Sequence, residues 1–182
     1  MKPVIFAVTG PPGAGKTSVS RALLSHFAQG VHLEVDALRG MVVVGMSDSV
    51  PEWTDETERQ FQLAEAAACD LAVRYFDAGM SVAIDHCRNL PRWDQFLAAH
   101  LGDRPVVRVL LLPPIDINLE RNRRRTNKPF DPVVLEDIVH HMNQRYLTEI
   151  SPRWTLIQNE EASASELAAQ ILREHCGRQS GT

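Results

Sequence analysis

This sequence of 182 residues has few cysteines, few aromatic residues and no excess of basic residues. Its three cysteines, Cys69, Cys87 and Cys176, are widely spaced and contain no CxxC pair. This pattern argues against a disulfide framework and against a zinc site, and it predicts reduced thiols in a cytoplasmic protein. The net charge of −4 lacks the basic excess that is typical of proteins that bind nucleic acid.

Long apolar runs are also missing. No run approaches the roughly 20 residues that are needed to cross a bilayer, so we expect no membrane partner. The apolar residues of the N-terminal segment MKPVIFAVTG lead directly into a glycine-rich loop. They therefore predict a strand rather than a signal peptide.

Valine- and isoleucine-rich runs alternate with helix-like runs along the chain. Strands are predicted at residues 4–8, 31–35, 81–84, 106–112 and 154–158. Helices are predicted at about 16–28, 55–78, 92–99, 116–125, 132–149 and 165–175. Asp131 before Pro132, and a capping box of Ser163 with Glu166, mark two of the helix starts. The pattern predicts an α/β fold with a five-stranded parallel sheet covered by helices on both faces, in one domain of residues 1–177 with a flexible tail at 178–182.

The segment GPPGAGKT, from Gly10 to Thr17, stands between the first strand and the first helix. It satisfies the pattern GxxxxGK[ST], in which glycines let backbone N–H groups approach phosphate oxygens and the following helix offers its positive end. We therefore expect a P-loop NTPase fold that binds ATP and Mg²⁺. Lys16 is expected to reach the β- and γ-phosphates, and the Thr17 hydroxyl to ligate Mg²⁺. The predicted nucleotide contacts are Gly10, Pro11, Pro12, Gly13, Ala14, Gly15, Lys16, Thr17 and Ser18.

Two aspartates follow predicted strands, Asp36 after VHLEV and Asp85 after SVAI. Because the carboxyl ends of parallel strands meet at one edge of a sheet, both carboxylates are expected beside the glycine loop. In phosphoryl transfer one acid organises Mg²⁺, and another orients and deprotonates the attacking hydroxyl. Asp85 suits the metal role and Asp36 the base, although the two roles can be exchanged. Alternatively, Asp36 caps a short turn that ends at Arg39, and Asp85 is capped by local N–H groups.

The spacing of the glycine loop, VDALRG and AIDHC resembles that of the small P-loop kinases grouped with chloramphenicol phosphotransferase and zeta toxin. The similarity is most pointed at VDAL, where chloramphenicol phosphotransferase has a strand-end aspartate that serves as base. The resemblance implies the strand order 2-3-1-4-5 and transfer of the γ-phosphoryl group of ATP to a hydroxyl of a small molecule. It places Lys16 and Thr17 at the phosphates and Mg²⁺, and Asp36 as the base.

Arginines cluster in the segment LERNRRRTNKPFDP. An arginine over the transferred phosphoryl group stabilises the charge that spreads over its oxygens. The similar kinases carry a mobile lid with arginines between the fourth and fifth strands, which corresponds here to residues of about 121–131. Arg121 and Arg125 share a helix face and are the favoured catalytic arginines. The alternative is a solvated helix end in which Glu120 pairs with Arg124.

The segment of residues 41–53, MVVVGMSDSVPEW, follows Asp36 and is largely apolar. Either it forms a wall of an acceptor pocket through Met41, Met46 and Trp53, or it covers the edge of the sheet. Arg39 either binds an anionic group of the acceptor or pairs with Glu34 or Asp36, and Arg88 lies just past the sheet edge. The predicted substrate contacts are Asp36, Arg39, Trp53, Asp85 and Arg88.

Together these features predict an ATP-dependent kinase that phosphorylates a hydroxyl group of a small molecule. Two alternatives stay open. A nucleotide or polynucleotide 5′-hydroxyl kinase would need a basic path toward Asp36, for which Arg39 and Arg88 are the available residues. An ATP-binding resistance or sequestration module would keep the nucleotide site with little turnover.

Overall fold

The computed structural model describes residues 1–50, 52–124, 135–158 and 160–179. Within these ranges a sheet is formed by β1 (Ile5–Thr9), β2 (Gly30–Glu34), β3 (Ser81–His86), β4 (Val106–Leu111) and β5 (Trp154–Ile157). All of its neighbouring strands are parallel, and their order is β2-β3-β1-β4-β5. The predicted parallel α/β fold and the strand order implied by the resemblance are confirmed.

The helices between the strands are α1 (Lys16–Leu24), α2 (Val35–Arg39), α3 (Asp55–Asp77), α4 (Leu90–Leu101), α5 (Ile115–Arg123) and α6 (Glu136–Glu149), and α7 (Ala164–Gln179) follows β5. None of these described helices is both long and apolar enough to span a membrane. The last turn predicted for the first helix is wrong, because the amides of His26 and Phe27 bond to carbonyls only three residues back. The predicted start at Asp131 and Pro132 lies outside the described residues.

Hydrogen bonds at the helix starts explain two of these boundaries. The amide of Glu166 donates to Ser163 Oγ at 3.3 Å, and the Ser163 amide donates to the Glu166 carboxylate at 2.8 Å. This confirms the predicted capping box. At the start of α3, the side chains and amides of Thr54 and Thr57 bond reciprocally, which satisfies two N–H groups that the helix itself leaves unpaired.

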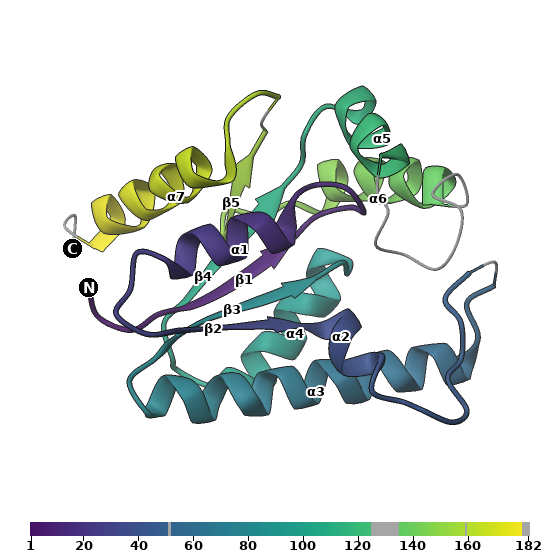
Figure 1. The fold of residues 1–182 in the computed structure, drawn as a ribbon, viewed down its shortest axis with the longest axis horizontal. Helices are drawn as coiled ribbons and strands as arrows, with labels where there is room; N and C mark the ends of the chain where they lie inside the picture. Colours follow the sequence, from purple (N-terminus) through teal and green to yellow (C-terminus); the bar gives the residue numbers. More distant parts are fainter. Residues whose placement is uncertain (51, 125–134, 159, 180–182) are drawn as a thin grey trace.

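Two hydrophobic cores lie on the two faces of the sheet (Figure 1), with α1 and α7 on one face and α3, α4 and α6 on the other. In β1, Ile5 and Ala7 face the α3 side, whereas Phe6 and Val8 face the α1 side. The same alternation runs through β3, where Ile84 faces α3. Because side chains alternate along a strand, this places Asp85 toward α1 and His86 toward α3.

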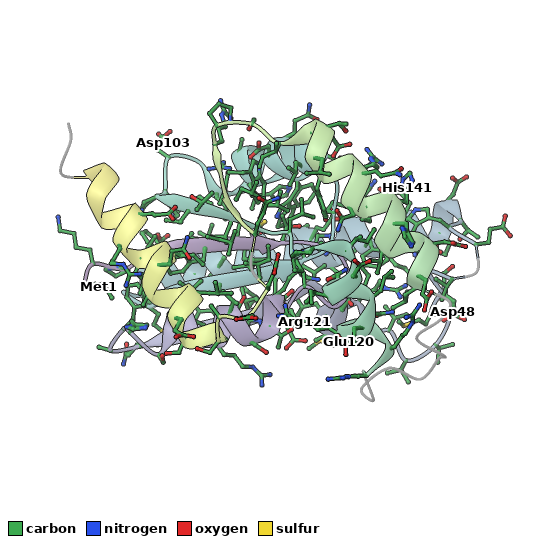
Figure 2. All side chains as sticks on the ribbon, turned by 90° about the horizontal axis from the view of Figure 1, so that it is seen from above. Met1, Asp48, Asp103, Glu120, Arg121 and His141 are labelled. Carbon is green, nitrogen blue, oxygen red and sulfur yellow. The ribbon has the colours of Figure 1, made fainter. Side chains whose placement is uncertain are left out.

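The carboxyl ends of the strands share one edge, and the glycine loop, α2 and the start of α5 lie along it (Figure 1). In the second view, Met1 and Asp103 lie at the opposite end of the molecule from Asp48 and His141 (Figure 2). Strand β3 runs two residues further than predicted, because Asp85 and His86 pair with Val8 and Thr9 of β1. Asp85 therefore lies within the last two residues of β3 and not directly after the strand, which corrects the prediction.

Candidate active site

The glycine loop, residues 10–17, turns tightly between β1 and α1. A Cβ atom at Gly10 would clash with the carbonyl oxygen of Leu111, so the residue at this position must be glycine for the loop to lie against β4. Gly13 has a φ of 85°, a left-handed conformation that side chains rarely adopt. The ammonium group of Lys16 donates to the Pro11 carbonyl at 3.2 Å and so lies across the loop. This is the geometry of a loop that presents backbone N–H groups and one cation to an anion.

Thr17 and Asp85 meet beside the loop, as the sequence predicts. The Thr17 hydroxyl donates a hydrogen bond of 2.6 Å to Asp85 Oδ2. The His32 ring, on β2, lies 3.4 Å from the same oxygen. Burial by itself would raise the pKa of Asp85, but His32, Lys16 and Thr17 together hold it below its ordinary value. The carboxyl group is therefore an ionised oxygen donor next to a hydroxyl, a donor pair that suits Mg²⁺.

Asp36 does not stand directly after a strand, and the prediction is corrected in this respect. Strand β2 ends at Glu34, and Asp36 lies exposed in the first turn of the short helix α2. A short helix does end at Arg39, but its N-cap residue is Glu34, so the alternative in which Asp36 caps it is wrong. A second observation relates Asp36 to the glycine loop through the Cys87 thiol.

The Cys87 thiol is affected by charges from both parts of the predicted site. Burial raises its pKa, the Lys16 ammonium opposes this shift, and the carboxylates of Asp36 and Asp85 add to it. Asp36 and Lys16 are therefore both close enough to act on one side chain at the end of β3. Helix α2 follows β2 directly, so Asp36 lies near the carboxyl end of that strand, and its position opposite the phosphate-binding loop stays a prediction.

Arg39 and Trp53 both pack on one ring of α3. The guanidinium of Arg39 is buried, lies 4.3 Å from the centre of the Phe61 ring and donates to the Ser47 carbonyl at 2.5 Å. Trp53 stacks on Phe61 with ring centres 4.8 Å apart and remains about half exposed. Arg39 thus holds the segment that follows α2 against α3, while Trp53 presents an indole face at the surface. Their contact with a substrate stays a prediction.

Arg88 lies buried between two glutamates of α3. It contacts the carboxylate of Glu58 at 2.6 Å and that of Glu65 at 3.0 Å, and its guanidinium carbon lies 5.7 Å from the centre of the Trp53 ring. Glu65 also contacts His86 at 2.8 Å, and the side chains of both residues are 1% exposed. Two carboxylates therefore compensate the charge of Arg88 before any ligand arrives, and its predicted contact with a substrate remains untested.

We expect Glu65→Gln to destabilise the protein much more than Glu58→Gln. Glu65 compensates Arg88 inside the protein, where removing one charge partner costs about 3 kcal/mol or more. Glu58 is 25% exposed, so water can replace part of its contacts and the expected loss is about 1 kcal/mol. Urea unfolding curves of the two variants measure these losses. Equal losses would contradict the role of Glu65 as the buried partner.

The acid dependence of stability gives a further expectation for Glu58. Burial by itself would raise the pKa of Glu58, but Arg88, Gln62 and Arg92 lower it from 4.5 to about 2. The group thus binds fewer protons when folded, so its contribution is complete above pH 4.5 and is lost as the pH falls toward 2. The stability difference between wild type and Glu58→Gln, measured by urea unfolding, should shrink across this window. A difference that stays constant there would contradict the depressed pKa.

The arginines of the predicted lid are placed only in part, since Arg125 and the lid residues that follow it lie outside the described residues. Arg121 donates to the Glu160 carbonyl at 2.9 Å and so joins α5 to the loop after β5. Arg124 pairs with Glu120 at 2.6 Å, which confirms the alternative of a solvated ion pair at this helix end. Arg123 pairs with Glu136 of α6. Among the described arginines of this run, Arg121 therefore contacts the loop after β5, at the carboxyl edge of the sheet.

Three positions of the site are missed by sequence reasoning. Glu65 had a detectable signal, because it lies four residues from Phe61 and three from Ala68 and so falls on the buried stripe of α3. His32 and Tyr146 had none. The Tyr146 hydroxyl donates to the Arg88 carbonyl at 3.0 Å, and burial raises its pKa well above the ordinary value, so the group stays protonated. Tyr146 thereby anchors the segment after β3 to α6.

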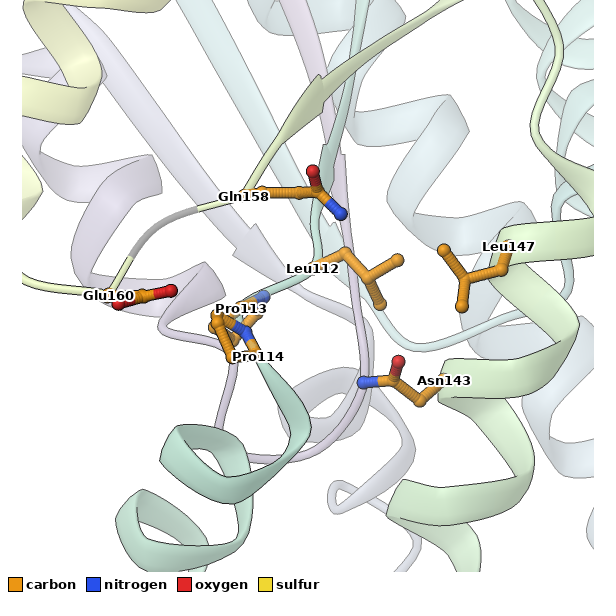
Figure 3. Close-up of a pocket in the computed structure, with 7 residues that line it drawn as sticks. All are labelled: Leu112, Pro113, Pro114, Asn143, Leu147, Gln158 and Glu160. Atoms are coloured by element: carbon orange, nitrogen blue, oxygen red, sulfur yellow. The ribbon is translucent and has the colours of Figure 1, made fainter.

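A cavity of about 280 Å³ lies on the α6 side of the carboxyl edge (Figure 3). Its walls are formed by Leu112, Pro113, Pro114, Asn143, Leu147, Gln158 and Glu160. It includes none of the residues predicted to bind nucleotide or acceptor. The predicted site therefore lies outside this cavity.

Comparison with solved structures relates the arrangement to known folds. Shikimate kinase from Acinetobacter baumannii, in complex with shikimate, is 18% identical with a TM-score of 0.62, over 97% of this chain and 94% of that chain. A gluconokinase from Sinorhizobium meliloti 1021 is 21% identical with a TM-score of 0.64, over 98% of each chain. Thymidylate kinase from Candida albicans is 10% identical with a TM-score of 0.68, over 98% of this chain and 93% of that chain. These likenesses show the fold alone, and it is the fold of P-loop kinases.

The class of the protein follows from this fold and from the phosphate-binding loop that β1 and α1 build: it is a kinase-like P-loop phosphotransferase. The sequence model of the chloramphenicol phosphotransferase-like protein family matches residues 3–171. Because the match covers most of the chain, the protein belongs to the chloramphenicol phosphotransferase-like family, and the predicted resemblance is confirmed. A comparison with curated protein sequences gives no match.

Proposed function

We propose that the protein transfers the γ-phosphoryl group of ATP, together with Mg²⁺, to a hydroxyl group of a small molecule. The observation that carries this proposal is the 2.6 Å hydrogen bond from Thr17 to the ionised Asp85 beside the glycine loop. A hydroxyl and a carboxylate at this position supply the two protein groups that P-loop enzymes use around Mg²⁺. The family and the fold support phosphoryl transfer as the reaction class.

The residues on the nucleotide side would act through charge and hydrogen bonding. The amides of the glycine loop and the Lys16 ammonium would bind the β- and γ-phosphates. Thr17 and Asp85 would hold Mg²⁺, which supplies neutralisation of the phosphate charge when bound. Among the described residues, no group of three or more His, Cys, Asp or Glu gathers into a metal site. This agrees with Mg²⁺, which prefers one or two protein oxygens together with water and phosphate.

On the acceptor side, Asp36 would accept the proton of the attacking hydroxyl. Its carboxylate is exposed at the carboxyl edge, where an alcohol can reach it, and its charge acts on the same thiol as that of Lys16. General bases of this kind contribute a factor of about 10²–10⁴ to the rate. Arg121 and Arg125 are proposed to stabilise the charge of the transferred group, and Arg121 lies on the helix that leads into the predicted lid.

The residues on the predicted acceptor side favour an uncharged acceptor with an apolar part. Arg88 is compensated by Glu58 and Glu65, so it has little capacity left for an anionic substituent. Several exposed side chains that follow α2 are apolar, with Met41 70% exposed and Met46 40% exposed. Together with the indole of Trp53 they would contact hydrocarbon or aromatic surface of the acceptor. The same compensation of Arg88 disfavours a polynucleotide acceptor.

Radiolabelled ATP offered with separate pools of acceptors tests the proposal. The pools are neutral hydroxylated metabolites and antibiotics, hydroxylated acids, nucleotides and oligonucleotides with a 5′-hydroxyl. Transfer to a neutral alcohol is the expected result. Transfer to a nucleotide or oligonucleotide instead identifies the alternative kinase, and tight ATP binding without transfer to any pool identifies a sequestration module.

A further inference from the structure

The middle of the glycine loop lies directly on helix α5. Asn118 is fully buried, and its side-chain amide donates to the Pro12 carbonyl at 2.9 Å. A Cβ atom at Gly13 would lie 2.9 Å from the backbone oxygen of Asn118 and 3.2 Å from the backbone nitrogen of Asn122. Distances this short leave no room for a side chain at residue 13. The conformation of the loop therefore depends on where α5 lies.

The same helix also reaches the segment that follows β5. Arg121, three residues after Asn118, donates to the Glu160 carbonyl at 2.9 Å. At its start, the backbone amide of Asn118 donates at 3.0 Å to the carbonyl of Pro114, which is the N-cap residue of α5. A short helix with one side-chain hydrogen bond to each of two loops transmits a displacement of one loop to the other. The described end of α5 also leads into the predicted lid.

We propose that Asn118 is a positioning residue that couples the phosphate-binding loop to the loop after β5. The Asn118 amide fixes the Pro12 carbonyl on α5, and Arg121 on the same helix fixes the Glu160 carbonyl. Binding of phosphates at the glycine loop consequently orders residues 160–163 through helix α5. The inference rests on the proposed function only in requiring that the glycine loop binds phosphate. It adds to that function that residues 160–163, in the loop after β5, become ordered when the glycine loop binds phosphate.

The variant Asn118→Leu tests the coupling role of Asn118 without a large expected loss of stability. Among the described residues none donates a hydrogen bond to the Asn118 side-chain oxygen, so leucine removes one hydrogen bond and one unsatisfied buried acceptor at similar volume. Pro12 is only partly buried, so losing the hydrogen bond to its carbonyl is expected to cost less than it would at a fully buried residue. The stability of the variant is therefore expected to stay near that of wild type. Glu120→Gln is the matched control, since Glu120 lies on the same helix and pairs with Arg124 at the surface (Figure 2).

Hydrogen exchange with inorganic tripolyphosphate as the ligand tests the coupling without any phosphoryl transfer. In wild type and in Glu120→Gln, tripolyphosphate is expected to slow amide exchange both in residues 10–18 and in residues 160–163. In Asn118→Leu the affinity for tripolyphosphate should fall about tenfold, the effect of one lost hydrogen bond. At saturating ligand, this variant should show protection of residues 10–18 alone.

A second variant tests the other end of the helix and does not alter the buried contact. Arg121→Gln should retain protection of residues 10–18 and lose that of residues 160–163. Protection of both segments in Asn118→Leu, or in Arg121→Gln, would overturn the coupling. If wild type does not bind tripolyphosphate, the assignment of the glycine loop is wrong, and the proposed function fails with it. The experiment thus distinguishes a failure of the coupling from a failure of the proposed function.

Discussion

Replacing Asp36 by asparagine is expected to abolish most phosphoryl transfer while ATP binding is retained. The amide has nearly the shape of the carboxylate but cannot accept the proton of the attacking hydroxyl. Loss of a general base lowers the rate by about 10²–10⁴-fold. Initial rates with radiolabelled ATP and the accepted alcohol, together with calorimetric titration of ATP, measure the two quantities separately.

The matched control for this variant is Asp103→Asn. Asp103 is an exposed aspartate at the opposite end of the molecule (Figure 2), so its replacement should leave both transfer and ATP binding unchanged. Near-normal transfer by Asp36→Asn would remove Asp36 as the base. If Asp36→Asn instead needs more Mg²⁺, and the loss of rate appears in Asp85→Asn, then Asp36 holds the metal and Asp85 is the base.

Lys16→Ala is expected to weaken ATP binding by about 10–100-fold, which corresponds to the loss of a charge-assisted hydrogen bond. The ammonium group lies across the glycine loop on the Pro11 carbonyl, where it can reach phosphates bound by the loop amides. Calorimetric titration with ATP and with tripolyphosphate should show the same loss, because the contact is made to phosphate.

The control for this charge is Lys2→Ala. Lys2 is an exposed lysine before β1, remote from the carboxyl edge, and its removal should leave ATP affinity unchanged. Unchanged affinity in Lys16→Ala would contradict the assignment of the glycine loop. A loss for ATP that is absent for tripolyphosphate would place Lys16 on the nucleoside instead of the phosphates.

Local patterns in the sequence predicted the fold and the arrangement of the glycine loop with Thr17 and Asp85. The alternation of apolar strands with helices predicted the sheet, because burial on both faces requires apolar residues throughout each strand. The motif GPPGAGKT predicted the loop, since its glycines meet backbone requirements within a few residues. Thr17 and Asp85 were predicted to meet because parallel strands share one edge, and their hydrogen bond confirms it.

The acceptor side was predicted less well, because short helices and paired charges depend on neighbours that the local sequence does not reveal. VDALRG was interpreted as the end of a strand and the start of an acceptor segment, yet residues 35–39 form helix α2. Arg39 and Arg88 were candidates for substrate contact, and the structure places them on Phe61 and between two glutamates. The sequence around an arginine near the edge of the sheet is the same whether that arginine contacts a substrate or is held by neighbouring side chains of the protein.

The sequence by itself determined that this chain forms a phosphate-binding loop on a parallel sheet, since strand periodicity and glycine spacing act over neighbouring residues. Only the tertiary structure decided which side chains support that loop. Asn118, whose side-chain amide holds the Pro12 carbonyl, is 106 residues from Pro12 in the sequence. A contact at such a separation depends on where α5 packs in the folded chain, and packing is set by the whole core.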